Sequence, residues 1–163
     1  MLVFAQGEAE NRGLAAWTAA RIDHVDGFAP PCQCAAVTDA AGRVVAGIVF
    51  HDWQPAAGTL QLSMAAESPA WASRAVLAAL FRYAFVTNGA AKLWTATPHR
   101  SERALRFNLG IGMRREAVLR HQFGPGRHAV ICSMLAREWR RSRWNGRPPR
   151  RPARQASCTR GER

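Results

Sequence analysis

The sequence predicts an α/β (α+β) domain with a mixed, mostly antiparallel central sheet of about six to seven strands flanked by helices. Hydrophobic residues follow a helical period in three segments, and six other segments are rich in strand-forming residues bounded by turn residues. Hydrophobic residues make up 48% of the chain, which is sufficient for a packed core. The length of 163 residues fits one such domain with an extension.

The first half of the chain predicts one helix followed by three antiparallel strands. Leu14 and Trp17 lie at helical spacing within the expected helix, residues 9–22. Glycine-containing turns then separate three segments rich in strand-forming residues. These expected strands span residues 32–38, 44–53 and 59–65.

The second half predicts two helices that alternate with three strands. Ser68-Pro69 begins the first of these helices, because serine can cap a helix and proline loses no hydrogen bond in the first turn. Its hydrophobic residues from Val76 to Phe85 share one face, and Asn88-Gly89 ends it. The remaining elements are expected in this order: a strand at 92–97, a helix at 101–109, and strands at 115–123 and 128–135 joined by a hairpin.

The net charge of +12 is concentrated at the C-terminal end. Residues 1–136 carry 13 basic and 9 acidic side chains, a net +4, whereas residues 137–163 carry 10 arginines and 2 glutamates, a net +8. Prolines and mutually repelling arginines after Asn145 disfavour both helix and strand. We therefore expect a domain at residues 1–139 and a disordered Arg/Pro-rich tail at residues 140–163.

The expected tail has two interpretations. Its arginines could bind the phosphates of a nucleic acid, since each such contact releases counterions. The tail could equally be a solvated terminus that only improves solubility. The sequence leaves both open, so a nucleic acid is an expected partner through this tail alone.

Nothing in the sequence indicates a membrane protein or a metal protein. No segment approaches the ~18 consecutive apolar residues of a spanning helix, and the start Met1–Ala5 lacks the basic lead of a signal peptide. A cytoplasmic location is therefore expected. Cys32 and Cys34 form a single paired motif without the second one that a zinc site needs. Three histidines of the second half are interpreted as turn or strand-surface groups: His99, His121 and His128.

Two segments in the second half carry a family resemblance. Residues 103–120 read Arg-Ala-Leu-Arg-Phe-Asn-Leu-Gly-Ile-Gly-Met-Arg-Arg-Glu-Ala-Val-Leu-Arg, and residues 130–139 include Ser-Met-Leu-Ala-Arg-Glu-Trp. They are similar to a helix, a Leu-Gly-Phe turn and the last strands of the GNAT superfamily of acyl-CoA-dependent N-acetyltransferases. The closest branch comprises ribosomal-protein and aminoglycoside acetyltransferases, and the resemblance spans roughly residues 10–139.

The resemblance implies an acetyl-CoA-dependent N-acetyltransferase with a GNAT-like sheet. Such an enzyme transfers an acetyl group directly to a primary amine in a ternary complex, without a covalent enzyme intermediate. Acetyl-CoA would be the co-substrate, and no metal is implied. The acceptor would be a small molecule or a protein amine, and the enzyme a monomer or a homodimer.

The acetyl-CoA loop of the family is degenerate in this chain. In the family, a strand is followed by Pro, an aromatic residue and a glycine-containing loop that opens the central helix. Pro69 and Trp71 match this pattern, but Ala75 replaces the central glycine. The backbone N–H groups of a helix start can still bind a pyrophosphate. The resemblance assigns cofactor binding here to Trp71, Ala72, Ser73, Arg74, Ala75 and Val76; the alternative is that Ser68-Pro69 merely starts a core helix.

The resemblance also assigns roles to the strand before this loop and to the next helix. Met64, Ala65 and Ala66 would bind the pantetheine arm through the main chain, where a backbone N–H polarises the thioester carbonyl. Ser101 would contact the CoA arm and take part in catalysis, or would merely cap its helix.

A general base is useful because the acceptor amine must lose a proton. Glu67, at the end of the same strand, is the first candidate. Glu116, His51 and Asp52 are alternatives, each of which could instead be a surface or ion-pairing group.

A second function class remains open from the sequence. The altered loop also suits a catalytically impaired GNAT-fold binding module that uses the Arg-rich tail on a nucleic acid or ribosome. A structural or accessory protein is a third hypothesis.

Overall fold

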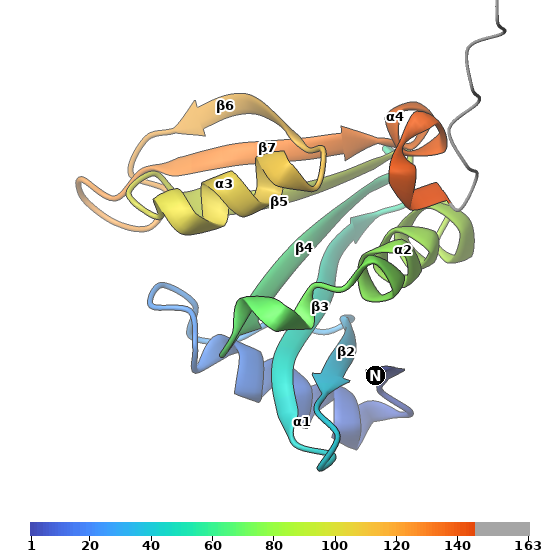
Figure 1. Ribbon diagram of the computed structural model, residues 1–163. Helices are drawn as coiled ribbons and strands as arrows, with labels where there is room; N and C mark the ends of the chain where they lie inside the picture. The colour runs from blue at the N-terminus through green and yellow to red at the C-terminus, as the bar shows by residue number, and fades with distance from the viewer. Residues whose placement is uncertain (146–163) are drawn as a thin grey trace, which may run out of the picture.

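A computed structural model describes residues 1–145 of the chain and shows one seven-stranded sheet (Figure 1). The order of strands in the sheet is β1-β2-β3-β4-β5-β7-β6. The strands are β1 (Leu2–Phe4), β2 (Gln33–Thr38), β3 (Val44–Gln54), β4 (Thr59–Ala66), β5 (Lys92–Pro98), β6 (Arg114–Leu119) and β7 (Ala129–Leu135). All neighbouring pairs are antiparallel except β4 and β5. The predicted fold class is confirmed.

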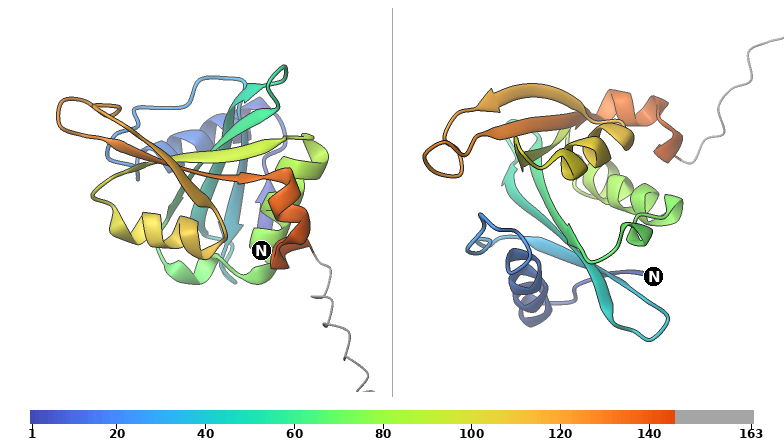
Figure 2. Two further views of the ribbon diagram at one scale, coloured as in Figure 1. Left: turned by 90° about the horizontal axis from the view of Figure 1, so that it is seen from above. Right: turned by 60° about the vertical axis from the view of Figure 1, so that its left-hand side comes forward.

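Helices cover both faces of the sheet (Figure 2). They are α1 (Glu8–Ala19), α2 (Arg74–Arg82), α3 (Glu102–Gly110) and α4 (Ala136–Arg141), with short 3-10 turns η1 (Pro69–Trp71) and η3 (Arg143–Asn145) and a π-helical turn η2 (Tyr83–Thr87). Leu80 and Phe81 of α2 belong to the same core as Ile48 of β3. Ala15 of α1 packs with Val49 on the opposite face. No helix within residues 1–145 is long and apolar enough to cross a membrane.

The first strand was not predicted from the sequence. β1 is three residues long and adds to the edge of the sheet, where Leu2 lies opposite Val37 of β2. A three-residue segment is too short to show an alternating pattern, so its pairing becomes visible only in the folded chain.

The predicted helix at Ser68-Pro69 divides into two elements. Ser68 caps only the turn η1, by accepting a hydrogen bond from the N–H of Ala70. The chain then leaves the helical conformation, and α2 begins at Arg74 after a second cap at Ser73. The start of the helix therefore lies five residues later than the sequence predicts.

The C-terminal end of the folded region extends beyond the predicted boundary. The boundary between residues 139 and 140 falls inside α4, and η3 follows it. Trp144 of η3 is only 7% exposed and donates a hydrogen bond from Nε1 to the carbonyl of Ile111 at 2.7 Å. Residues 140–145 therefore pack on the domain, and the predicted disordered tail beyond them lies outside the described residues.

Substitutions of Trp144 test whether η3 packs on the domain. We expect Trp144→Ala to lower the free energy of unfolding by about 3–5 kcal/mol, because a large buried ring is removed. Trp144→Phe should cost less, since it keeps a ring and leaves only the Ile111 carbonyl unpaired, about 1–3 kcal/mol. Urea unfolding of both variants measures this difference. Wild-type stability in Trp144→Ala would mean that η3 does not pack in solution.

Candidate functional site

The parallel strands β4 and β5 pair for only three residues and then part. The paired positions run from Thr59 opposite Lys92 to Gln61 opposite Trp94. Beyond them the two strands diverge, as Figure 1 shows. β4 keeps its antiparallel partner β3 to its last residue, Ala66. Alternate backbone N–H and C=O groups on the free edge of β4 therefore face the gap rather than a neighbouring strand.

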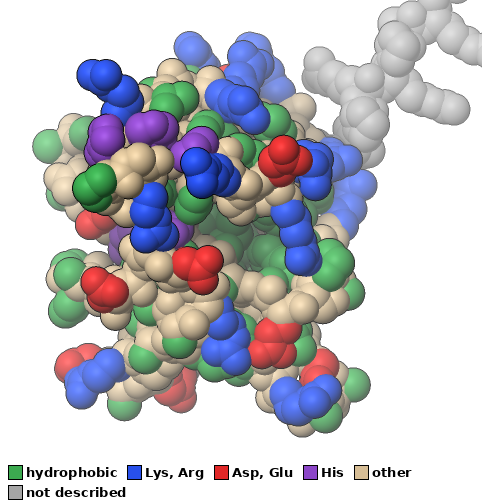
Figure 3. Space-filling model, turned by 90° about the vertical axis from the view of Figure 1, so that its left-hand side faces the viewer, with side chains coloured by type: hydrophobic (Ala, Val, Ile, Leu, Met, Phe, Trp, Pro, Cys, Tyr) green, Lys and Arg blue, Asp and Glu red, His purple; other side chains and the backbone are tan. Residues whose placement is uncertain are grey.

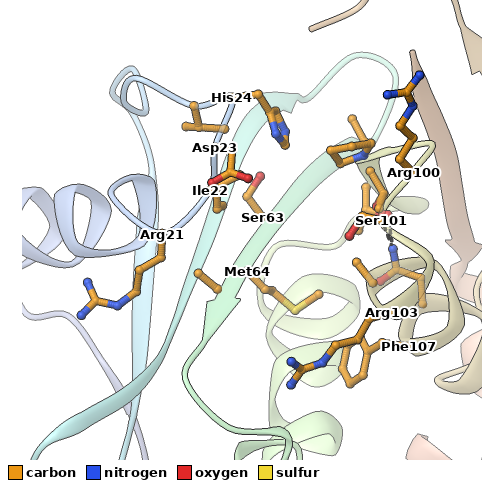
Figure 4. Close-up of a pocket in the computed structure, with 18 of the residues that line it drawn as sticks. Arg21, Ile22, Asp23, His24, Ser63, Met64, Arg100, Ser101, Arg103 and Phe107 are labelled. Carbon is orange, nitrogen blue, oxygen red and sulfur yellow. Dashed lines mark hydrogen bonds between the residues drawn. The ribbon is translucent and has the colours of Figure 1, made fainter. Parts of the chain in front are cut away.

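A cleft of about 820 Å³ occupies this divergence. Its walls are residues 62–66 of β4 and 95–98 of β5, with α3, the loop after α1 and the β6–β7 hairpin around them. Figure 3 shows the cleft as a hollow in the surface of the molecule. In Figure 4, Ser63 lies on the side of His24, whereas Arg103 and Phe107 of α3 lie on the opposite side. The cleft thus has two distinct sides.

Asn108 fixes α3 to β5 beyond the last pair with β4. Its side-chain N–H₂ donates to the hydroxyls of Thr95 and Thr97, each at 3.0 Å, and the residue is only 3% exposed. Both threonines lie beyond the last pair with β4. α3 is therefore fixed to the part of β5 that forms the wall of the cleft.

Five of the residues predicted to bind the cofactor line the cleft. Met64, Ala65 and Ala66 supply the wall from β4, and Trp71 and Ser101 lie at its border. Trp71 also packs against Phe107 of α3, with ring centroids 5.5 Å apart. The Ser101 hydroxyl does not cap α3. The alternative role of Ser101 as a helix cap is therefore not what the structure shows.

The remaining predicted residues, at the start of α2, do not line the cleft. Ser73, Ala75 and Val76 border a separate groove of about 630 Å³, together with the ends of β1 and β2. The Ser73 hydroxyl accepts a hydrogen bond from the Val76 N–H, and the Arg74 guanidinium donates to the Arg143 carbonyl. These side chains are thus already engaged within the protein.

The backbone of this degenerate loop does not require glycine. None of residues 68–76 has a positive φ, so Ala75 introduces no left-handed strain. Among residues 1–145, the N–H groups of Arg74 and Ala75 have no hydrogen-bond acceptor, as is usual for the first turn of a helix. The exposed start of α2 therefore keeps two donors that suit a phosphate.

Glu67, the first candidate for the general base, does not line the cleft. Its carboxylate forms an ion pair with Arg21 at 3.0 Å, and about half of its side chain is exposed. Glu116 is also outside the cleft, where a hydrogen bond from Lys92 lowers the pKa of the carboxyl group. The structure brings neither carboxylate to the point where the strands part.

The other two candidates, His51 and Asp52, connect to the cleft through Ser63. His51 Nε2 lies 2.9 Å from Ser63 Oγ, and His51 Nδ1 lies 3.1 Å from Asp52 Oδ2. Ser63 lines the cleft. The register places Gln61 opposite His51, so Ser63 is its diagonal neighbour.

The sequence does not show the contact between His51 and Ser63, because the β3–β4 hairpin is irregular. The pairing shifts between His51 and Gln54, where Asp52 adopts a left-handed φ of 48°. In a regular hairpin, the register would follow from the turn, and His51 and Ser63 could be recognised as neighbours from the sequence. The position of a bulge cannot be predicted from the hydrophobic pattern.

Positive charge dominates the lining of the cleft. Among residues 1–145, one acidic residue lines it, Asp23, and four arginines do: Arg21, Arg100, Arg103 and Arg127. His99 and His128, predicted as turn or strand-surface groups, also line it. Loss of hydration and the positive charges around His128 lower its pKa. Within residues 1–145, no group of His, Cys, Asp or Glu is arranged to hold a metal ion.

The His24 and Phe123 rings connect two segments that lie far apart in sequence. Their centroids are 3.7 Å apart, and His24 lines the cleft. Burial, followed by the charge of Arg127, lowers the pKa of His24. The loop after α1 and the β6–β7 hairpin thus meet at one end of the cleft.

Solved structures of acetyltransferases share this fold. One whose acetyltransferase assignment is provisional is 29% identical and aligns over 68% of this chain and 60% of its own, with a TM-score of 0.59. A second structure with the same provisional assignment, from T. thermophilus, is also 29% identical. It aligns over 68% of this chain and 62% of its own, with a TM-score of 0.57. The chain therefore spans about 60% of the length of these two relatives.

A spermidine N-acetyltransferase from Vibrio cholerae, described as a dodecamer in an intermediate state, aligns more completely. It covers 85% of this chain and 95% of its own at 12% identity, with a TM-score of 0.66. No protein-family model and no curated protein sequence matches the chain. The structural likeness supports the predicted GNAT-like fold, and the branch within the superfamily stays a prediction.

Asn108→Leu tests the contact that fixes the wall of the cleft. The variant leaves the hydroxyls of Thr95 and Thr97 without their donor, so we expect a loss of about 1–3 kcal/mol in the free energy of unfolding. A triple variant that adds Thr95→Val and Thr97→Val should recover much of this loss, because no unpaired polar group then remains. If the triple variant were as unstable as Asn108→Leu, the loss of stability would come from the packing of the side chain at position 108 and not from its hydrogen bonds.

Proposed function

We propose that this chain is an acetyl-CoA-dependent N-acetyltransferase that transfers an acetyl group directly to a primary amine. The observation that carries the proposal is the cleft between β4 and β5, in which one wall is the unpaired edge of a strand. An extended pantetheine arm offers amide groups that can pair with such an edge as a further strand would. The acetyltransferase assignments of the structural neighbours support the same activity.

The free edge of β4 also suits stabilisation of the reaction. Attack on a thioester places negative charge on its carbonyl oxygen, and a fixed backbone N–H lowers the energy of that charge. We assign this donor to the stretch from Met64 to Ala66, which borders the cleft. Small side chains at Ala65 and Ala66 leave room for a ligand beside the main chain.

The start of α2 fits the phosphates of acetyl-CoA through its backbone alone. The N–H groups of Arg74 and Ala75 are free within residues 1–145, and the first turn of a helix attracts anions. Contributions from the side chains of Ser73 and Arg74 are less favourable, because both groups already have partners. Binding at this end is therefore assigned to the main chain.

Acetyl-CoA should stabilise the folded protein if it binds the cleft. At a concentration 100 times the Kd, a ligand adds about 2.7 kcal/mol, which corresponds to a rise in Tm of about 5–10 °C for a chain of this size. We expect Ala104→Trp, on the α3 side of the cleft, to abolish the rise. Differential scanning fluorimetry with millimolar acetyl-CoA measures it.

The control for this variant is Ala57→Trp, in the exposed turn between β3 and β4. It adds the same ring away from the cleft and should keep the full rise in Tm. Absence of any rise in the wild-type chain would contradict the proposed function, and an equal rise in Ala104→Trp would place the ligand elsewhere.

The charges of the cleft favour an acceptor that carries an anionic group beside its amine. Four arginines and one aspartate line the cleft, a poor environment for a polycation. Burial is the main cause of the lowered pKa of His24 and of His128, and the charges of Arg127 and Arg100, respectively, lower these pKa values further. We therefore propose a carboxylate- or phosphate-bearing amine as the acceptor class.

A direct comparison of acceptors tests this class. We expect a higher kcat/KM for an acidic dipeptide with a free α-amine than for spermidine, measured as release of free thiol from acetyl-CoA. Arg127→Gln should lower the value for the dipeptide about fivefold, equivalent to ~1 kcal/mol for an exposed ion pair. Arg82→Gln, on the exposed surface of α2, is the matched control. Faster acetylation of spermidine would contradict the assignment.

A further inference from the structure

We infer that Ser63, His51 and Asp52 form a proton-accepting relay that takes the proton from the attacking amine. The inference rests on the proposed function and adds the identity of the base, which the sequence placed first at Glu67. Ser63 is the member that contacts the acceptor, His51 stores the proton, and Asp52 positions His51.

The hydrogen bonds of His51 fix the direction of proton transfer. A carboxylate only accepts hydrogen bonds, so the 3.1 Å contact with Asp52 requires the proton of neutral His51 to be on Nδ1. Nε2 then carries a lone pair and accepts from the Ser63 hydroxyl at 2.9 Å. The free lone pairs of Ser63 Oγ can accept from an amine in the cleft.

The surroundings of His51 keep it neutral and ready to accept a proton. Its side chain is only 11% exposed, and the ring of Phe28 packs on it with centroids 5.0 Å apart. Burial lowers the pKa of His51, and the charge of Asp52 partly offsets this effect. Gln61, directly opposite on β4, carries no charge.

The backbone at Asp52 departs from regular strand geometry in the way that this arrangement requires. Successive side chains of a regular strand point to opposite faces, so His51 and Asp52 could not contact each other there. The bulge and the left-handed φ of 48° at Asp52 turn its carboxylate back toward the ring. Such a conformation is costly for most residues but is tolerated best by Asp and Asn.

The position of Ser63 in the sheet places the relay on the acceptor side. Leu62 of β4 packs in the core beneath α2, so Ser63, the next residue, points to the opposite face. Figure 4 shows Ser63 on the side of Asp23 and His24, across the cleft from Arg103 of α3. A group bound along the α3 side therefore has its reactive end between the two walls.

The transfer step balances without any further reactant. The amine nitrogen forms a bond to the thioester carbon, and the carbon–sulfur bond breaks with its electron pair on sulfur. One amine proton passes to Ser63 Oγ as the hydroxyl proton of Ser63 passes to His51 Nε2. Solvent later takes the proton from His51 and supplies one to the thiolate, so the products are an amide and a thiol.

A purely structural role is the competing explanation, since the same hydrogen bonds also tie β3 to β4. Kinetics distinguish the two explanations. A general base contributes about 10²–10⁴-fold, so we expect His51→Gln and Ser63→Ala to lower kcat by about 10²-fold or more with the acceptor acetylated fastest by the wild type. The rise in Tm with acetyl-CoA should persist in both variants.

The pH profile gives a readout that packing alone would not move. His51 acts only when unprotonated and its pKa is lowered, so wild-type kcat should fall on the acid side with a midpoint below about 6.5. His51→Gln should lose this limb. Asn also tolerates the left-handed φ, so Asp52→Asn should shift the acid limb of the pH profile. Its loss of kcat should be smaller, because the Asp52 carboxylate is largely exposed.

The matched control for Ser63→Ala is Ser142→Ala, because Ser142 is also a half-buried serine with hydrogen bonds.

Nitrogen NMR of the wild-type protein tests the relay without any acceptor. We expect the neutral tautomer of His51 with its proton on Nδ1. A proton on Nε2 would overturn the relay, because the Ser63 proton could not then pass to His51.

The rival bases provide the remaining outcomes. A large loss of kcat in Glu67→Gln or Asp23→Asn, together with near wild-type kcat in His51→Gln, would overturn the relay and leave the acetyltransferase intact. Loss of the acetyl-CoA response in the wild type would instead remove the proposed function and the catalytic role of the relay with it.

Discussion

The early end of pairing between β4 and β5 is the constraint on which the rest of the structure depends. Two parallel strands that continued to pair would satisfy each other and leave no space for a ligand. Here the pairing stops at Gln61, and Asn108 binds the hydroxyls of Thr95 and Thr97 just beyond it. α3 is thus fixed to the face of β5 beside the cleft. The cleft and the unpaired edge of β4 both lie where the pairing has ended.

The alternation of side chains along β4 gives the two sides of the cleft different chemistry. Leu62 joins the core beneath α2, whereas Ser63 turns to the other face and meets His51. Main-chain groups are therefore available for a cofactor along one side, and a chain of polar side chains is available for an acceptor on the other. The left-handed backbone at Asp52 is strained, and the surrounding sheet holds it in place. Such strained residues are common at functional sites.

Much of the fold follows from the sequence because long segments repeat their hydrophobic residues with one period. The α2 segment was found through its apolar face, although its start at Arg74 was not, because two serine caps lie close together at Ser68 and Ser73. β1 was missed because three residues carry no pattern, and η3 because arginines and prolines around Trp144 obscured a buried residue.

The site was less predictable than the fold. The resemblance predicts cofactor contacts at Met64, Ala65 and Ala66, and these residues line the cleft. Glu67, the first candidate for the general base, does not line it. The contact between His51 and Ser63 depends on a strand register that the hydrophobic pattern does not show.

A crystal structure with coenzyme A would show whether the ligand binds along the unpaired edge of β4. We expect the pantetheine arm to lie along β4 beyond Gln61 with its sulfur near the stretch Ser63–Ala65, and Asn108 to keep its contacts to Thr95 and Thr97. Coenzyme A bound away from this cleft, or β5 paired with β4 along its whole length, would contradict this expectation.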